Sequence, residues 1–77
     1  PATRLDYTVG HPGHLTLKIY NLRGELVRTL VDAQVESDGF VMWDGRDDRG
    51  TAVASGIYFR EARFGDETLV GKLALVK

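Results

Sequence analysis

The sequence predicts an all-β domain built as a sandwich of antiparallel strands. Apolar residues recur at every second position in several short runs, which is the period of a half-buried strand. No stretch has the ~3.6-residue period of an amphipathic helix. Glycine, proline and asparagine separate the runs at short intervals, as turn residues do in antiparallel sheets.

Two strands open the chain. Apolar and polar residues alternate over residues 4–9 and again over residues 15–20. The segment GHPG at residues 10–13 lies between them. Because proline has no amide donor and glycine accepts positive φ, the chain is expected to reverse there.

A third strand is expected over residues 25–32. The segment NLRG at residues 21–24 fits a hairpin made of a type I turn and a left-handed glycine. Apolar residues then stand on both alternating faces, so the periodicity leaves the inward face of this strand open.

The fourth strand is expected from Gly39 to Asp44. Val41 and Trp43 alternate there with two other apolar residues. Trp43, the only tryptophan, buries the largest area that one side chain can offer and is the expected centre of the core.

Three strands complete the prediction. Thr51 to Ala54 is a short edge strand, Gly56 to Phe64 is a longer one, and a tight turn leads into Thr68 to Val76. We therefore expect one domain over residues 1–77, a seven-stranded antiparallel sandwich of immunoglobulin or fibronectin type. A closed barrel is the alternative.

Composition excludes several classes of function. A formal charge of −1, without blocks of charge, gives no reason to expect nucleic acid as a partner. No apolar run approaches the ~20 residues that span a bilayer, and the first residues do not begin a signal peptide. The chain has no cysteine, so it can form neither a disulfide nor a thiolate metal site.

The segment WDGRDDRG, residues 43–50, admits two interpretations. The carboxylates of Asp44, Asp47 and Asp48 are ligands that calcium prefers. An EF-hand pattern counted from Asp44 fails, however, because an arginine occupies its third position and a glycine its twelfth. The favoured interpretation is that Asp44 closes an Asx-type turn, that Gly45 and Gly50 adopt special backbone angles, and that Asp47 or Asp48 accepts nearby backbone amides.

Other chemistry has little support in the sequence. His11 and His14 flank a turn, but a zinc site needs three or four ligands, and no acidic or cysteine residue lies nearby in the sequence. Ser37 and Ser55, the two serines, lack the surroundings of a catalytic nucleophile. We therefore expect no enzyme activity, no metal and no cofactor.

One apolar stripe has a functional interpretation. If Tyr58 faces the core, Ile57 and Phe59 face outward, and exposed apolar patches often mark interfaces. The alternative is coverage within the domain itself. A carbohydrate-binding sandwich is a further alternative, with Tyr20 and Tyr7 as its candidate sugar contacts.

Segments along the chain resemble two related bacterial families. The segments LTLKIYNLRGELVRTLVD, WDGRDDRGTAVASGIYF and GKLALVK are similar to C-terminal sorting domains of proteins exported by the type IX secretion system. The immunoglobulin-like domain of flagellar hook-capping proteins shares the middle part. The matching residues include the Trp43-Asp44-Gly45 turn, Gly50 and the glycine-x-tyrosine of Gly56 and Tyr58. The usual asparagine-proline lead is reduced to Pro1-Ala2-Thr3.

The resemblance implies a non-catalytic module of a larger secreted protein, at its C-terminal end. Such a module is recognised by the outer-membrane secretion machinery and directs its passenger to the cell surface through the periplasm. Lys72 and Lys77, which flank the apolar final strand, would then contact this partner, whereas Ile57 and Phe59 would form the contact surface of an accessory or assembly domain. The alternative is a structural accessory domain that packs on a neighbouring domain or mediates assembly.

Overall fold

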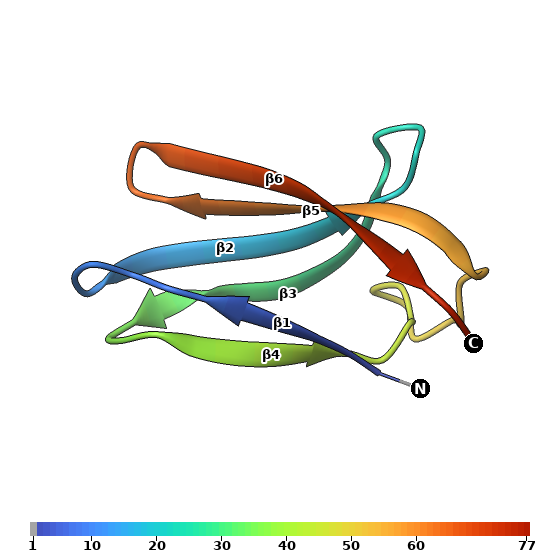
Figure 1. Cartoon of the computed structure of the whole chain (residues 1–77), viewed down its shortest axis with the longest axis horizontal. Coiled ribbons are helices and arrows are strands. Elements are labelled where there is room, and N and C mark those ends of the chain that lie inside the picture. Colours follow the sequence, from blue (N-terminus) through green and yellow to red (C-terminus); the bar gives the residue numbers. More distant parts are fainter. Residues whose placement is uncertain (1) are drawn as a thin grey trace.

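The domain is a sandwich of two antiparallel sheets (Figure 1). The computed structural model describes residues 2–77, and Pro1, the first residue of the expected lead, lies outside them. The strands are β1 (Thr3–Tyr7), β2 (Gly13–Tyr20), β3 (Leu26–Val35), β4 (Gly39–Trp43), β5 (Gly56–Phe64) and β6 (Glu67–Leu75).

The two sheets differ in size. The larger sheet has four strands in the order β3-β2-β5-β6, and the smaller one pairs only β1 with β4. All the strand pairs are antiparallel. No strand in residues 2–77 belongs to both sheets, so the fold is an open sandwich and the barrel alternative is wrong.

The prediction of seven strands is wrong by one. The expected edge strand at Thr51–Ala54 is reduced to a single bridge between Arg46 and Ala52. The backbone groups of this region form hydrogen bonds inside their own loop. The Asp47 amide donates to the Thr51 carbonyl (2.9 Å), and the Val53 amide donates to the Gly45 carbonyl (2.9 Å). A loop that closes on itself in this way leaves no row of groups to join a sheet.

Irregular pairing explains why the third strand has no clean alternation. The register between β2 and β3 shifts twice, between Leu17 and Lys18 and between Ile19 and Tyr20. Each irregularity changes which residues of β3 face inward. Val27, Leu30 and Val31 consequently all pack against the core, although strict alternation would separate Leu30 from the two valines.

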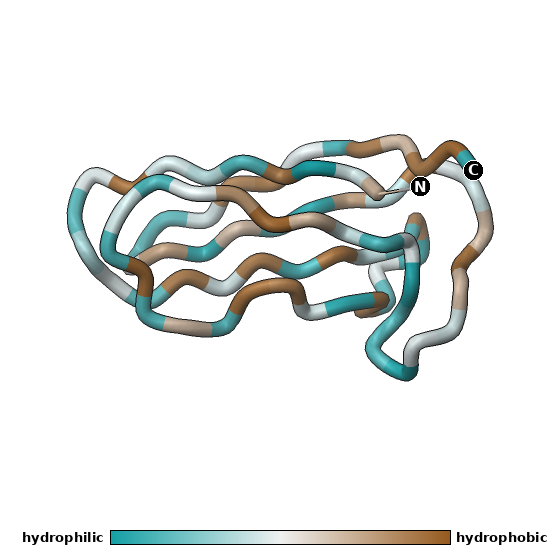
Figure 2. The backbone as a smooth tube through the Cα atoms, turned by 90° about the horizontal axis from the view of Figure 1, so that it is seen from below, coloured by the Kyte–Doolittle hydropathy of each residue, from teal (hydrophilic) through white to brown (hydrophobic). Residues whose placement is uncertain are grey.

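The core lies between the sheets, toward the end where β4 stops. Its buried residues are Leu5, Leu17, Ile19, Trp43, Tyr58 and Leu75. Apolar and polar segments alternate along the strands, as the hydropathy colours show (Figure 2). That alternation gives each sheet one face for the core and one for solvent.

Candidate functional site

The segment at residues 43–50 folds as a hydrogen-bonded loop. The Asp44 carboxylate accepts the Arg46 amide (3.1 Å). The Asp47 carboxylate accepts the amides of Arg49 (2.9 Å) and Thr51 (3.0 Å). Gly50 has a φ of +84°, a left-handed conformation that favours glycine. The aspartate side chains thus accept hydrogen bonds from backbone amides that the turn leaves without a backbone partner.

Arg28 of β3 fastens this loop to the larger sheet. One guanidinium nitrogen donates to the Asp44 carboxylate (3.2 Å) and to the Arg46 carbonyl (3.1 Å). Asp48 pairs with the edge of β3, since its amide donates to the Val27 carbonyl (3.0 Å) and its carboxylate accepts the Thr29 amide (3.0 Å). The loop therefore occupies part of an edge that would otherwise be free.

These contacts bear on the calcium interpretation. Each of the three aspartates already accepts a backbone amide, and Arg28 lies against two of them. Within residues 2–77 no group of three or more histidine or carboxylate side chains is placed to share an ion. The loop is a structural connection between the sheets.

Trp43 and Tyr58 form the centre of the closed end. The tryptophan is 0% exposed, and its ring meets Tyr58 edge-on with centroids 5.3 Å apart. Both polar tips are satisfied, because the indole donates to the Arg46 carbonyl (2.9 Å) and the Tyr58 hydroxyl donates to the Ala54 carbonyl (2.6 Å). Buried aromatic groups with paired tips contribute packing without an unpaired polar atom. Gly56 begins the same strand as Tyr58.

The histidines lie in separate environments. His14 pairs with Asp32 of β3, with 2.6 Å between its Nε2 and the carboxylate. His11 is close to the Pro12 carbonyl (2.9 Å), and its ring lies 5.2 Å from that of Phe64. Their imidazoles therefore have different partners.

The serines and tyrosines named in the sequence analysis do not come together in a common site either. Ser55 accepts the Lys77 amide (3.2 Å), and Ser37 contacts the Asp38 carbonyl (3.5 Å). Neither serine is hydrogen-bonded to a histidine in the described part of the chain. Tyr7 and Tyr20 lie in different sheets, so they form no common platform for a sugar.

The outer face of the larger sheet carries an apolar row. Leu26, Tyr20, Phe59 and Lys72 are directly opposite one another across the four strands. Ile57 lies next to this row on β5. Ile57 is 44% exposed and Leu26 49%, while Phe59 is half-buried by its neighbours. We call these five residues the outer row.

The two lysines of the final segment have different surroundings. Lys72 is exposed and lies beside Phe59 at the edge of the outer row. Lys77 follows the end of β6, and its ammonium group donates to the Val53 carbonyl. Lys72 is thus available on the sheet surface, whereas Lys77 contacts the loop that precedes β5.

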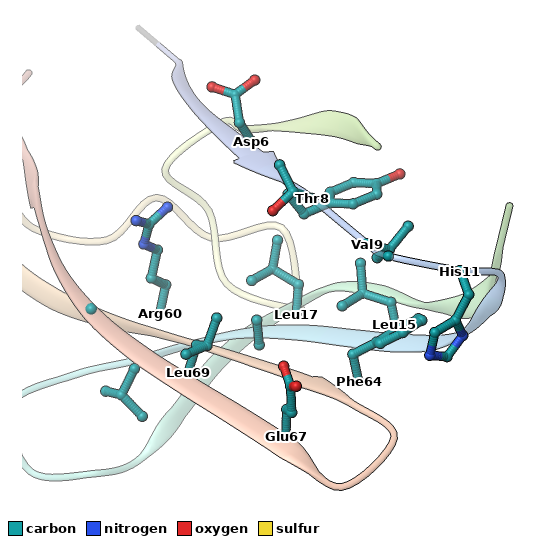
Figure 3. A pocket seen from close by; sticks show the side chains of 15 residues that line it. Asp6, Thr8, Val9, His11, Leu15, Leu17, Arg60, Phe64, Glu67 and Leu69 are labelled. Carbon is teal, nitrogen blue, oxygen red and sulfur yellow. The ribbon is translucent and has the colours of Figure 1, made fainter. Parts of the chain in front are cut away.

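A groove that the sequence did not indicate lies between the sheets at the opposite end (Figure 3). Its volume is about 340 Å³. Leu15, Leu17, Ala62 and Leu69 form an apolar floor, and Arg60 and Glu67 are its charged groups from the larger sheet. β1 and the loop after it form the other wall. Sequence alternation marks which residues face inward, but it does not tell how many strands cover them.

The chain matches one protein family. Residues 3–63 match the family described as the FlgD Ig-like domain. The comparison with curated proteins found no match, and neither did the comparison with solved structures. No helix in residues 2–77 has the length and apolar character needed to cross a membrane. Two antiparallel sheets agree with an immunoglobulin-like fold, and the match covers most of the sequence. The chain belongs to the family of FlgD Ig-like domains.

Proposed function

We propose that this domain is a non-catalytic accessory module that packs through its outer row on a neighbouring domain or assembly partner. The family supports an accessory role rather than a catalytic one. The outer row carries the proposal, because it gathers apolar side chains on the solvent face of the larger sheet.

The chemistry of the row favours a protein surface. Partly exposed leucine, isoleucine and aromatic side chains form the centre, and Lys72 lies at the margin. Interfaces commonly have this arrangement of an apolar centre and a polar rim. A shallow depression of about 270 Å³ adjoins Ile57 and adds exposed Leu22 to the surface.

Thermal unfolding of this domain inside its full-length protein, compared with the 77-residue chain alone, tests the proposal. Burial of the row by a neighbouring domain is expected to raise the melting temperature, since a partner that binds only the native state stabilises it. The substitution Ile57→Lys is expected to abolish that rise. Val70→Lys, an exposed position farther along the same face, is the matched control.

Sedimentation velocity of the 77-residue chain tests whether the outer row mediates self-association. Self-association that Ile57→Lys removes and Val70→Lys leaves intact would support it. A monomer at all concentrations, together with equal melting temperatures alone and in the full-length protein, would reject an interaction role for the outer row.

A second candidate function is the type IX sorting signal, with a secreted or cell-surface location reached through the periplasm. It rests on the resemblance of the final segment, residues 71–77, which lies beyond the matched residues 3–63. Lys72 would contact the outer-membrane machinery in this role. A reporter fused to the domain, with its natural upstream linker, should reach the surface of a bacterium that has this system; a reporter that stays in the periplasm would reject the role.

A further inference from the structure

The groove exists because the smaller sheet is too narrow to cover the larger one. The two strands β1 and β4 lie over a sheet of four, and β4 is on the side toward β3 (Figure 1). The turn at residues 65–66 joins β5 to β6. The inner face of β6 near this turn is consequently uncovered. Leu69 points to this inner face and is 69% exposed, whereas Leu75 on the same face is 2% exposed.

β1 has a free backbone edge along the groove. β4 takes one side of β1, and no second strand of residues 2–77 pairs with its other side. Residues Thr3–Tyr7 make no further backbone hydrogen bond outside this ladder within the described chain. An unpaired edge beside an apolar floor is a template for an added strand.

We infer that the groove binds an extended segment of another polypeptide, which adds a third strand to the smaller sheet at the free edge of β1. An added strand can interact with β1 and with the apolar floor of the groove at the same time. Its backbone pairs with β1, and its alternate side chains point down to Leu69 and Ala62.

The charges of the groove specify the segment further. Arg60 projects into the groove and has no ion-pair partner within residues 2–77. Asp6 on the opposite wall is paired with Arg4 (2.9 Å). Glu67, at the other end of the floor, also has no cationic partner among the described residues. The groove therefore offers one free positive group and one free negative group.

The spacing of these two groups fits one strand. Arg60 is opposite Gly71, and Glu67 lies four residues before Gly71 on β6. Four residues of extended chain span roughly 13 Å, so side chains at positions i and i+4 of the bound segment reach both groups. The residue between them, at i+2, faces Leu69 and is apolar.

Chain direction sets the order of the charges. β1 runs toward the 65–66 turn, because Tyr7 and the loop after it line the groove beside Phe64 and Glu67. A segment antiparallel to β1 runs the other way, from Glu67 toward Arg60. Antiparallel pairing is the mode of all the strand pairs in this domain. The bound segment therefore has a basic residue at position i, an apolar residue at i+2 and an acidic residue at i+4, with any residue between them.

A second folded copy of the chain does not meet this requirement. The strand that fills the groove must direct apolar side chains into it. In β1 and β4, the strands of the smaller sheet, the inward side chains Leu5 and Trp43 are buried in their own core. The edge strand β6 of a second copy presents Thr68, Val70 and Lys72 on its outer face, which includes no acidic group for Arg60. A segment that is free of its own sheet is therefore the occupant.

Synthetic heptapeptides test the proposal directly. TKTVTET carries the required order and TETVTKT the reversed order. In a titration of the isotopically labelled 77-residue chain, TKTVTET is expected to shift the amide NMR signals of β1 and to slow their hydrogen exchange. It should bind about tenfold more tightly than TETVTKT, since two charge pairs change from attractive to repulsive. N-methylation of TKTVTET on the side that faces β1 should abolish binding.

Charge reversal in the protein supplies the decisive control. The double substitution Arg60→Glu and Glu67→Lys should exchange the preference, so that TETVTKT binds about tenfold more tightly than TKTVTET. Thr68→Lys, one residue from Glu67 but on the outer face, should change neither affinity. Leu69→Ala should weaken both peptides.

Three results would overturn the proposal. The first is equal binding of both peptides with no response to the double reversal. The second is a set of peptide-induced shifts that maps to Tyr20 and Phe59 of the outer row instead of β1. The third is a concentration-dependent dimer of the chain that Arg60→Glu dissociates, which would make a second copy the occupant.

Discussion

The two ends of the sandwich are built from the same strands but finished differently. At the closed end, Trp43 and Tyr58 pack together and both pair their polar tips. At the open end, the two-stranded sheet is too narrow to cover β6 and leaves Leu69 at the surface. The buried aromatic pair thus lies at one end of the domain, and solvent-exposed apolar surface lies at the other.

This difference separates folding from binding. Residues at the closed end are surrounded by protein, so changes there act on the free energy of unfolding. Exposed residues of the groove, such as Leu69, have few native contacts to lose, so changes there can alter binding while the fold persists. Matched substitutions at the two ends measure how complete the separation is.

Trp43→Ala is expected to have the largest effect, a loss of about 3–5 kcal/mol in the free energy of unfolding. The change removes the largest fully buried side chain and leaves a cavity beside Tyr58. Urea denaturation followed by circular dichroism measures it. Trp43→Phe keeps an aromatic ring but loses the bond to the Arg46 carbonyl, so its cost should be smaller; equal costs would contradict this account of the closed end.

Two leucines on one face of β6 give a matched comparison. Leu75→Ala should cost about 2–5 kcal/mol, because this side chain is 2% exposed within the core. Leu69→Ala should change stability by no more than about 0.5 kcal/mol, because it is already in water. The same denaturation experiment measures both, and a cost above 2 kcal/mol for Leu69→Ala would mean that the groove is closed in solution.

Two glycines extend the comparison to the backbone. Gly45→Ala should cost about 1–2 kcal/mol, since Gly45 has a φ of +74° that disfavours a Cβ. Gly71→Ala should cost less than about 0.5 kcal/mol, because its φ is not positive and the nearest atom is the flexible Arg60 Nε at 3.1 Å. Melting curves of the two variants check this order, and the reverse order would contradict it.

Tyr58→Phe is expected to have the smallest effect at the closed end, about 1 kcal/mol. It keeps the ring against Trp43 and removes only the hydroxyl bond to the Ala54 carbonyl (2.6 Å). Thermal unfolding of the variant measures the cost. A loss as large as that of Trp43→Ala would show that the hydroxyl, rather than the ring packing, holds this end together.

Local patterns predicted much of this fold. The expected strand from Gly56 to Phe64 matches β5, and the expected turn at residues 65–66 joins β5 to β6. The strand follows from apolar–polar alternation and the turn from a glycine, and both are local features of the sequence. The inward face of β3 could not be read in the same way, because the register shifts against β2 depend on pairing between distant residues.

The groove could not be predicted for a related reason. Leu69 and Val70 are adjacent apolar residues in a strand, so one of them points to each face, but both are exposed. Whether an inward face is covered depends on how many strands the opposite sheet contains. That number is a property of the whole fold, and the absence of a paired strand at Thr51–Ala54 shows how easily it is misjudged from turn signals.

Both ends of the chain emerge at the Trp43 side of the molecule. Thr3 is opposite Trp43, and Lys77 contacts the loop at Val53 and Ser55, so the two ends lie together (Figure 1). Polypeptide joined at either end would leave from this side. The long axis of the domain extends 35 Å. The domain would therefore act as a short arm that holds its 65–66 tip, and the mouth of the groove, at a distance from whatever it is attached to.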